Sequence, residues 1–113
     1  SKKKYNFTFM NETFKQQVFE IIKMIPIGRF TTYGAIAKAV GFPNHSRYVG
    51  NALRNYNEDF PAHRVCSACG IISAESCIPK FTEKLAKEGV EVKGNKIQNF
   101  KQIFWNPLEE INL

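Results

Sequence analysis

The 113-residue sequence contains no long apolar run, and no stretch approaches the roughly 20 residues that a membrane-spanning helix requires. We therefore expect no membrane partner. The stretch Tyr5–Met10 is also too short and too mixed to be the apolar core of a secretory signal peptide. Both absences favour an intracellular protein, cytoplasmic in a prokaryote or nuclear in a eukaryote.

Cysteine is scarce, with three residues at positions 66, 69 and 77. A small, odd number does not predict the paired disulfides of a small secreted domain. Cys66 and Cys69 have the Cys-x-x-Cys spacing of a zinc site, but Cys77 and His63 do not form a standard second pair. A zinc site and a redox pair stay open as alternatives. The prediction is ordinary thiols, with no metal and no cofactor.

Acidic residues are outnumbered, since 10 Asp and Glu stand against 16 Lys and Arg, for a net charge of +6. This balance suits an anionic partner such as nucleic acid, although a soluble basic domain without such a partner has the same composition. A hydrophobic content of 43%, with ten Phe, is enough for one packed domain and does not suggest a second.

The first ten residues are predicted to form a basic, poorly ordered arm, so that the folded domain covers residues 11–113. Asn11 can cap a helix, and apolar residues recur at helical spacing from Phe14 to Ile25. Pro26 ends the pattern.

Two short helices joined by a tight turn are expected next. Thr32 can cap the first, and Gly41 stands where a C-terminal glycine belongs. The second is expected from about Ser46 to Asn55. Such a pair is typical of a helix-turn-helix unit, but also of ordinary packing in an α-rich domain, and the pattern alone leaves both open.

Beyond a loop at 57–61, one further helix is expected from about Pro79 to Glu88. Gly94-Asn95 between two short apolar segments predicts a β-hairpin. The tail at 104–107 is expected to pack on the core. The chain is thus predicted to be mainly α with small β elements.

Three segments resemble one family in their order and spacing. They are IPIGRFTTYGAIA at 25–37, SRYVGNA at 46–52 and PAHRV at 61–65, with EGV at 88–90 downstream. Over roughly residues 12–107 the chain is similar to the DNA-binding domain of the O6-alkylguanine-DNA alkyltransferases. The resemblance implies a single winged helix-turn-helix-like domain, as in the C-terminal domain of those enzymes.

The enzymes of this family carry Pro-Cys-His-Arg-Val at the third segment, whereas this chain has Ala62 in place of the reactive cysteine. Alkyl transfer requires a thiolate that attacks the alkyl carbon, which a methyl side chain cannot do. The departure points to the non-enzymatic alkyltransferase-like proteins. His63 and Glu88 match residues that help to deprotonate the cysteine, so here they are vestigial and no residue is catalytic.

The resemblance implies a DNA lesion sensor that binds the minor groove, flips O6-alkylguanine into a pocket and flags it for nucleotide excision repair. Its partners would be double-stranded DNA containing O6-alkylguanine and proteins of that pathway, and it would be a monomer. One alternative is an O6-alkylguanine-DNA alkyltransferase inactivated by a Cys-to-Ala change at residue 62. A remote alternative is a sequence-specific helix-turn-helix regulator that reads the major groove.

The resemblance also implies roles for single residues. Tyr33 crowds the 3′ phosphate of the target nucleotide, and Arg47 is the intercalating finger that fills the vacated space. The predicted DNA-binding residues are Thr32, Tyr33, Arg47, Gly50, Asn51 and Arg54. The predicted lesion pocket consists of Tyr33, Pro61, Ala62, His63, Val65, Ser76 and Ile78.

Three further residues carry expectations about packing. Arg64 is expected to tie its loop to the core rather than to contact DNA. Gly50 and Ala52 are small either because their helix presses on a minor groove or because it packs tightly on another helix, and the sequence leaves both alternatives open.

Overall fold

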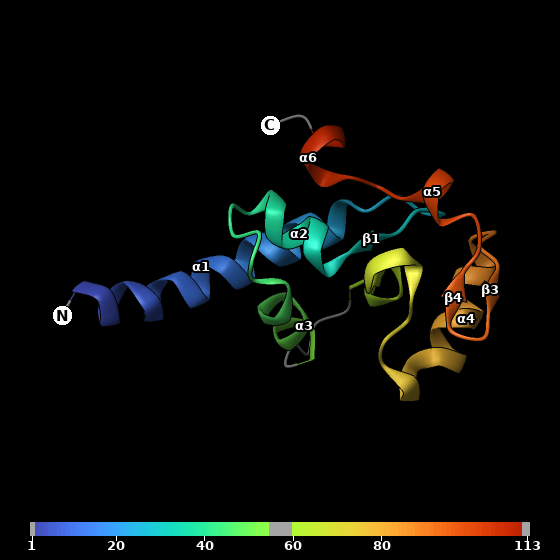
Figure 1. Ribbon diagram of the computed structural model, residues 1–113, viewed down its shortest axis with the longest axis horizontal. Helices are drawn as coiled ribbons and strands as arrows, with labels where there is room; N and C mark the ends of the chain where they lie inside the picture. The colour runs from blue at the N-terminus through green and yellow to red at the C-terminus, as the bar shows by residue number, and fades with distance from the viewer. Residues whose placement is uncertain (1, 55–59, 112–113) are drawn as a thin grey trace.

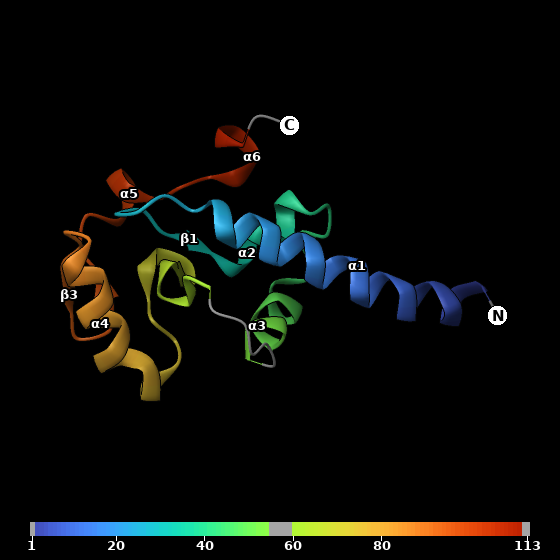
Figure 2. The same ribbon diagram turned by 180° about the vertical axis from the view of Figure 1, so that it is seen from behind.

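The computed structural model describes residues 2–54 and 60–111, with side chains from residue 13 onward (Figures 1 and 2). The α-helices are α1 (Lys2–Met24), α2 (Tyr33–Ala39), α3 (Ser46–Arg54), α4 (Ile78–Lys87), α5 (Phe100–Ile103) and α6 (Pro107–Glu110). The strands are β1 (Thr31–Thr32), β2 (Val65–Cys66), β3 (Val92–Lys93) and β4 (Lys96–Ile97). Three single 3-10 turns are η1 (Ala62–Arg64), η2 (Ala68–Gly70) and η3 (Glu75–Cys77).

The first helix is longer than the sequence pattern predicts. It begins at Lys2, so the predicted start at Asn11 is wrong, and its first half projects away from the other elements (Figure 1). A helix nucleated by packing from Phe14 onward can extend backwards at little cost, because each added residue forms a further hydrogen bond. The division into an arm and a domain at residue 11 stays a prediction.

The first three helices surround the larger of two hydrophobic clusters. Phe14 and Ile22 of α1 meet Ile36 of α2 and Val49 of α3, and all four side chains are buried. Trp105, from the C-terminal tail, is buried in the same cluster. The predicted packing of the tail on the core is therefore confirmed.

Helices α2 and α3 form the predicted helix-turn-helix pair. The Oγ1 atom of Thr32 accepts a hydrogen bond of 3.1 Å from the backbone N–H of Ala35, which confirms the predicted cap. Gly41 follows α2 with φ +91°, as expected of a C-terminal glycine. The predicted final residue of α3, Asn55, and residues 57–59 of the predicted loop lie outside the described residues.

Strands β1 and β2 pair in parallel, with Thr31 opposite Val65 and Thr32 opposite Cys66. Because the pairing is parallel, η1, which directly precedes β2, lies at the end of the pair where the chain enters β1. On the other side, the backbone N–H of Trp105 donates to the carbonyl of Phe30 at 2.7 Å.

The second hydrophobic cluster joins the β1 segment to α4 and to the hairpin. Phe30, Leu85 and Ile97 are its buried centre, and they come from the β1 segment, α4 and β4. Strands β3 and β4 pair antiparallel around Gly94, which confirms the predicted hairpin. Helix α4 begins and ends one residue earlier than predicted. The hairpin stands in the position of a wing after the helix-turn-helix.

The architecture is mainly helical with small sheets, as the sequence predicts. Among the residues that the structure describes, no helix combines the length and the apolar character that a membrane crossing demands.

Candidate nucleic-acid interface

The predicted DNA contacts on α3 lie three or four residues apart and share one helix face. They are Arg47, Gly50, Asn51 and Arg54. The three longer side chains are exposed, whereas Val49 and Ala52 on the opposite face are buried against α1 and α2. α3 contains two arginines and no acidic residue, so its outer face carries positive charge. Such a face can bind phosphate.

Gly50 lies in open space as far as the described residues show. Apart from its own helix backbone, a Cβ atom built at this position would meet no heavy atom of residues 2–54 and 60–111 within 4 Å. Tight packing on the described helices therefore does not account for this glycine, whereas Ala52 is buried in the larger cluster, where packing accounts for its small side chain. The open space allows the α3 backbone to approach a ligand closely, as in a narrow groove of a duplex.

Tyr33 is the first residue of α2 and is half-buried. Its hydroxyl lies 3.4 Å from the Oγ atom of Ser73, which starts the segment leading into η3 and α4. The sequence does not predict this contact, because a serine forty positions from Tyr33 carries no local signal of it. The Thr32 hydroxyl is engaged in the cap of α2, so its predicted DNA contact stays a prediction.

Pro61 and Ala62 are half-buried where η1 begins, and His63 is buried with 8% of its surface exposed. Val65 belongs to the larger hydrophobic cluster at 3% exposure. The side chain at position 62 is thus a small apolar group next to a buried imidazole.

The last two predicted pocket residues lie on the segment after Ser73. Ser76 is exposed on η3, and Ile78 is half-buried at the start of α4, where it packs on the second cluster. The contact of each predicted pocket residue with a lesion stays a prediction.

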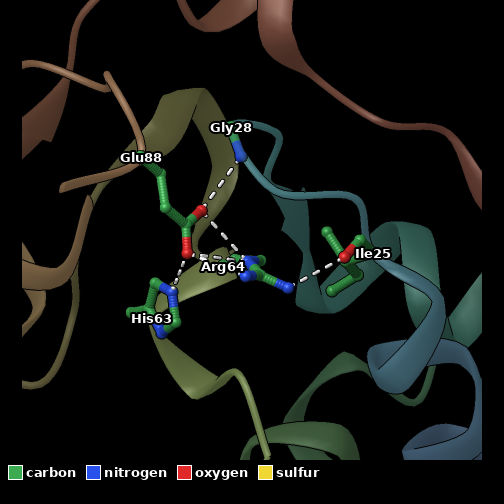
Figure 3. A network of polar contacts seen from close by, with 5 residues as sticks. All are labelled: Ile25, Gly28, His63, Arg64 and Glu88. Atoms are coloured by element: carbon green, nitrogen blue, oxygen red, sulfur yellow. Dashed lines mark hydrogen bonds and ion pairs between the residues drawn. The ribbon is translucent and has the colours of Figure 1, made fainter. Parts of the chain in front are cut away.

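A carboxylate holds the η1 loop in place (Figure 3). Glu88 Oε2 accepts hydrogen bonds from His63 Nε2 at 2.6 Å and from Arg64 Nη2 at 2.8 Å. Glu88 Oε1 accepts from the backbone N–H of Gly28 at 3.0 Å. Arg64 Nη1 also donates to the carbonyl of Ile25 at 3.0 Å, which confirms that Arg64 ties its loop to the core.

These contacts determine the charge state of Glu88. Burial alone would raise the pKa of this carboxyl group, but the hydrogen bonds from Arg64, Gly28 and His63 outweigh burial and lower the pKa to about 2. The group is therefore a carboxylate at neutral pH, which can only accept hydrogen bonds, so His63 Nε2 carries the shared hydrogen. The arrangement holds the η1 loop in place.

The cysteines are dispersed. Cys66 is fully buried on β2, and burial raises the pKa of its thiol to about 12, whereas Cys69 is exposed and Cys77 half-buried. Within residues 2–54 and 60–111, no three His, Cys, Asp or Glu side chains form a group that could hold a metal ion.

The fold and this face define a helix-turn-helix DNA-binding domain followed by a small wing. Residues 13–90 match the family described as 6-O-methylguanine DNA methyltransferase, DNA binding domain, and the chain belongs to this family.

Three relatives illustrate this membership. A Vibrio parahaemolyticus protein named DNA base-flipping protein is 36% identical over 99 residues, which cover 85% of this chain and 99% of that protein. Alkyltransferase-like protein 1 of Schizosaccharomyces pombe is 30% identical over 105 residues, covering 85% and 97%. The crystal structure of S. pombe Atl1 in complex with damaged DNA containing O6-carboxymethylguanine superposes with a TM-score of 0.77 at 30% identity, covering 85% of this chain and 97% of that one.

Proposed function

We propose that this protein is a non-enzymatic sensor that binds the minor groove of duplex DNA and flips O6-alkylguanine into a pocket beside Ala62. The observation that carries the proposal is the pairing of a basic helix-turn-helix face with a supported η1 loop whose position 62 is alanine. The names of the relatives support it, since they are a base-flipping protein, an alkyltransferase-like protein and a structure bound to damaged DNA.

The absence of a thiol at position 62 is the chemical reason for assigning no alkyl transfer. The nearest cysteine in sequence, Cys66, is buried on β2 and is protonated at neutral pH, because its thiol has a pKa of about 12. A protonated, buried thiol is a poor nucleophile. His63 and Glu88 then act as supports for the η1 loop.

Two residues would carry the base-flipping step. Extruding a base costs a few kcal/mol, and less where alkylation has already weakened the base pair. Tyr33, at the first turn of α2, would crowd the phosphate of the target nucleotide. Arg47 is exposed at the start of α3, and its planar guanidinium can stack on the neighbouring bases.

Binding to two matched duplexes tests the proposal. One duplex carries a single O6-methylguanine and the other a guanine at the same position, and fluorescence anisotropy gives both affinities. After incubation, mass spectrometry of the intact protein tests for a transferred methyl group. We expect tighter binding to the damaged duplex and an unchanged protein mass. Equal affinity for both duplexes would contradict the lesion sensor.

Two further observations separate the alternatives. An alkyltransferase inactivated by a Cys-to-Ala change is distinguished by the codon at position 62 of the native gene. A sequence-specific regulator would prefer one undamaged sequence over others, irrespective of a lesion. Neither alternative is favoured by an observation on the described side chains.

We further propose that the protein acts as a monomer and hands the lesion to nucleotide excision repair, in the cytoplasm of a prokaryote or the nucleus of a eukaryote. Analytical ultracentrifugation with and without the damaged duplex checks the first point, with one protein per duplex expected. Purified excision-repair recognition proteins added to the complex check the second, with a ternary complex expected.

A further inference from the structure

Helix α4 carries three lysines on one exposed face. Lys80, Lys84 and Lys87 follow each other at intervals of four and three residues, so they line up along the helix. All three are exposed, whereas Leu85 on the opposite face is buried in the second hydrophobic cluster. None of these lysines belongs to the helix-turn-helix or is needed to fill the core.

The lysines are largely free of acidic partners. Glu83 is the acidic residue of α4, and its carboxylate lies 3.7 Å from Lys87 Nζ in a pair that is more than 70% exposed on both sides. Exposed pairs of this kind are weak. Neither Lys80 nor Lys84 forms an ion pair with a residue of the described part of the chain.

The three lysines form a stripe along α4, and this lysine stripe is close in the chain to the proposed lesion site. The segment that begins at Ser73, whose hydroxyl faces the Tyr33 hydroxyl, passes through η3 and enters α4 at Ile78. The backbone of Ile72 is fixed to the hairpin by a hydrogen bond of 2.7 Å to the carbonyl of Asn95. Both views place the start of α4 and helix α3 along the same lower edge of the molecule (Figures 1 and 2).

We propose that Lys80, Lys84 and Lys87 bind backbone phosphates of the duplex that flanks the flipped nucleotide, so that α4 extends the DNA interface beyond the helix-turn-helix. This inference rests on the proposed function. A rise of 1.5 Å per residue separates the outer two lysines by about 10 Å along α4. Phosphates of one strand recur about every 3.4 Å along the duplex axis, so the stripe can reach two or three of them.

The chemistry of this face favours nucleic acid over an acidic protein. Lysine is a flexible point charge suited to phosphate, whereas the buried centres of protein–protein interfaces are depleted in lysine and need apolar or aromatic anchors. Within the described residues, the exposed large hydrophobic side chains lie elsewhere, at Met24, Ile27, Tyr48 and Leu108. The outer face of α4 offers no such anchor.

The salt dependence of binding tests the inference. The variant K80Q/K84Q/K87Q keeps residues that favour a helix, and K15Q/K23Q/K101Q removes the same charge from exposed lysines on α1 and α5. Each protein is titrated with the O6-methylguanine duplex between about 50 and about 200 mM salt. Log K falls linearly as log salt rises, and the loss of two or three phosphate contacts makes this fall less steep by about 2 to 3 in slope.

Over that salt range the affinity of the parent is expected to fall by a factor roughly 10 to 40 times larger than the factor for the α4 variant. The control variant is expected to match the parent. If the slope of the α4 variant equals that of the parent, α4 does not bind phosphate, and an acidic protein becomes the partner to consider. K84Q alone, with an expected decrease in slope of about 1, keeps the inference testable if the triple variant does not fold.

A second readout separates this inference from the proposed function. The ratio of affinities for damaged and undamaged duplex is expected to be the same in the parent and the α4 variant, because flanking phosphates are common to both. A parent protein without any lesion preference would refute the proposed function, whereas an unchanged salt slope refutes only the role of α4.

Discussion

Glu88 connects three parts of the chain through one carboxylate. It accepts hydrogen bonds from Gly28 after α1 and from His63 and Arg64 on η1, while Glu88 itself follows α4. Its side chain and that of Arg64 are 11% and 15% exposed, so the pair is mostly shielded from water. A shielded pair is costly to break from one side, because the remaining charge is left without a partner.

Replacing this carboxylate is expected to destabilise the fold. In Glu88→Gln the charge is lost while the shape is kept, and we expect the free energy of unfolding at neutral pH to fall by about 3 kcal/mol. Urea denaturation followed by circular dichroism measures the change. Glu83→Gln is the matched control, since that carboxylate is exposed and its loss is expected to have little effect. Equal stability of both variants would contradict the structural role of Glu88.

Arg47 is the residue on which the flipping step depends most directly. It is exposed at the start of α3, so its removal leaves the core untouched. Arg47→Ala is expected to weaken binding to the O6-methylguanine duplex by about 1–3 kcal/mol, the size of one lost stacking contact. Anisotropy titration measures it, with Lys15→Ala on α1 as control. A variant that binds as tightly as the parent rules out the intercalating role.

At the scale of elements, α3 is divided between packing and an open surface. Val49 and Ala52 hold it against α1 and α2, while Gly50 lies on the side where an added Cβ atom would meet no other atom of the described part of the chain. A glycine inside a helix costs stability relative to alanine, so its presence is better explained by binding than by folding.

The substitution Gly50→Ala is therefore expected to change stability and binding in opposite directions. The free energy of unfolding should rise by about 0.5–1 kcal/mol, because alanine favours the helix and fits the open space. Affinity for the damaged duplex should fall, because the added methyl group keeps the α3 backbone from the groove. Thermal denaturation and anisotropy give the two values. Unchanged affinity would mean that the duplex does not approach this face.

At the scale of the whole molecule, α1, η1 and α4 are joined through a group that titrates in acid. The pKa of Glu88 is about 2 in the folded protein, against an ordinary value of 4.5. The folded state therefore holds the deprotonated form more strongly than the unfolded chain does. This contribution to stability is complete above pH 4.5 and is lost as the pH falls towards 2.

Acid should therefore destabilise the parent more than a variant without this group. The two pKa values differ by about 2.5, which corresponds to about 3 kcal/mol that the parent is expected to lose between pH 5 and pH 2. Glu88→Gln lacks this contribution at every pH, so its stability is expected to change less over the same range. Urea midpoints measured across this range check the slopes. Parallel profiles for the two proteins would show that Glu88 is not the group responsible.

Local sequence patterns were sufficient to predict the parts of this fold that depend on residues close together in the chain. The Thr32 cap, the glycine after α2, the hairpin around Gly94 and the bounds of α4 to one residue were all predicted, because each depends on backbone conformations and hydrogen bonds within a few positions. The start of α1 was not, because helix propagation from a packed turn leaves no sharp signal. Motif order along the chain was also enough to indicate the family, which residues 13–90 confirm.

The contacts that join distant segments were decided by tertiary packing alone. No local pattern pairs Thr31 with Val65, places Ser73 against Tyr33, or brings the backbone of Gly28 to Glu88. Each contact forms only when both segments are folded, because the burial and the hydrogen bonds that stabilise it need both partners. The chain order therefore indicated which residues matter, and only the folded arrangement assigned Glu88 to support and Gly50 to an open surface.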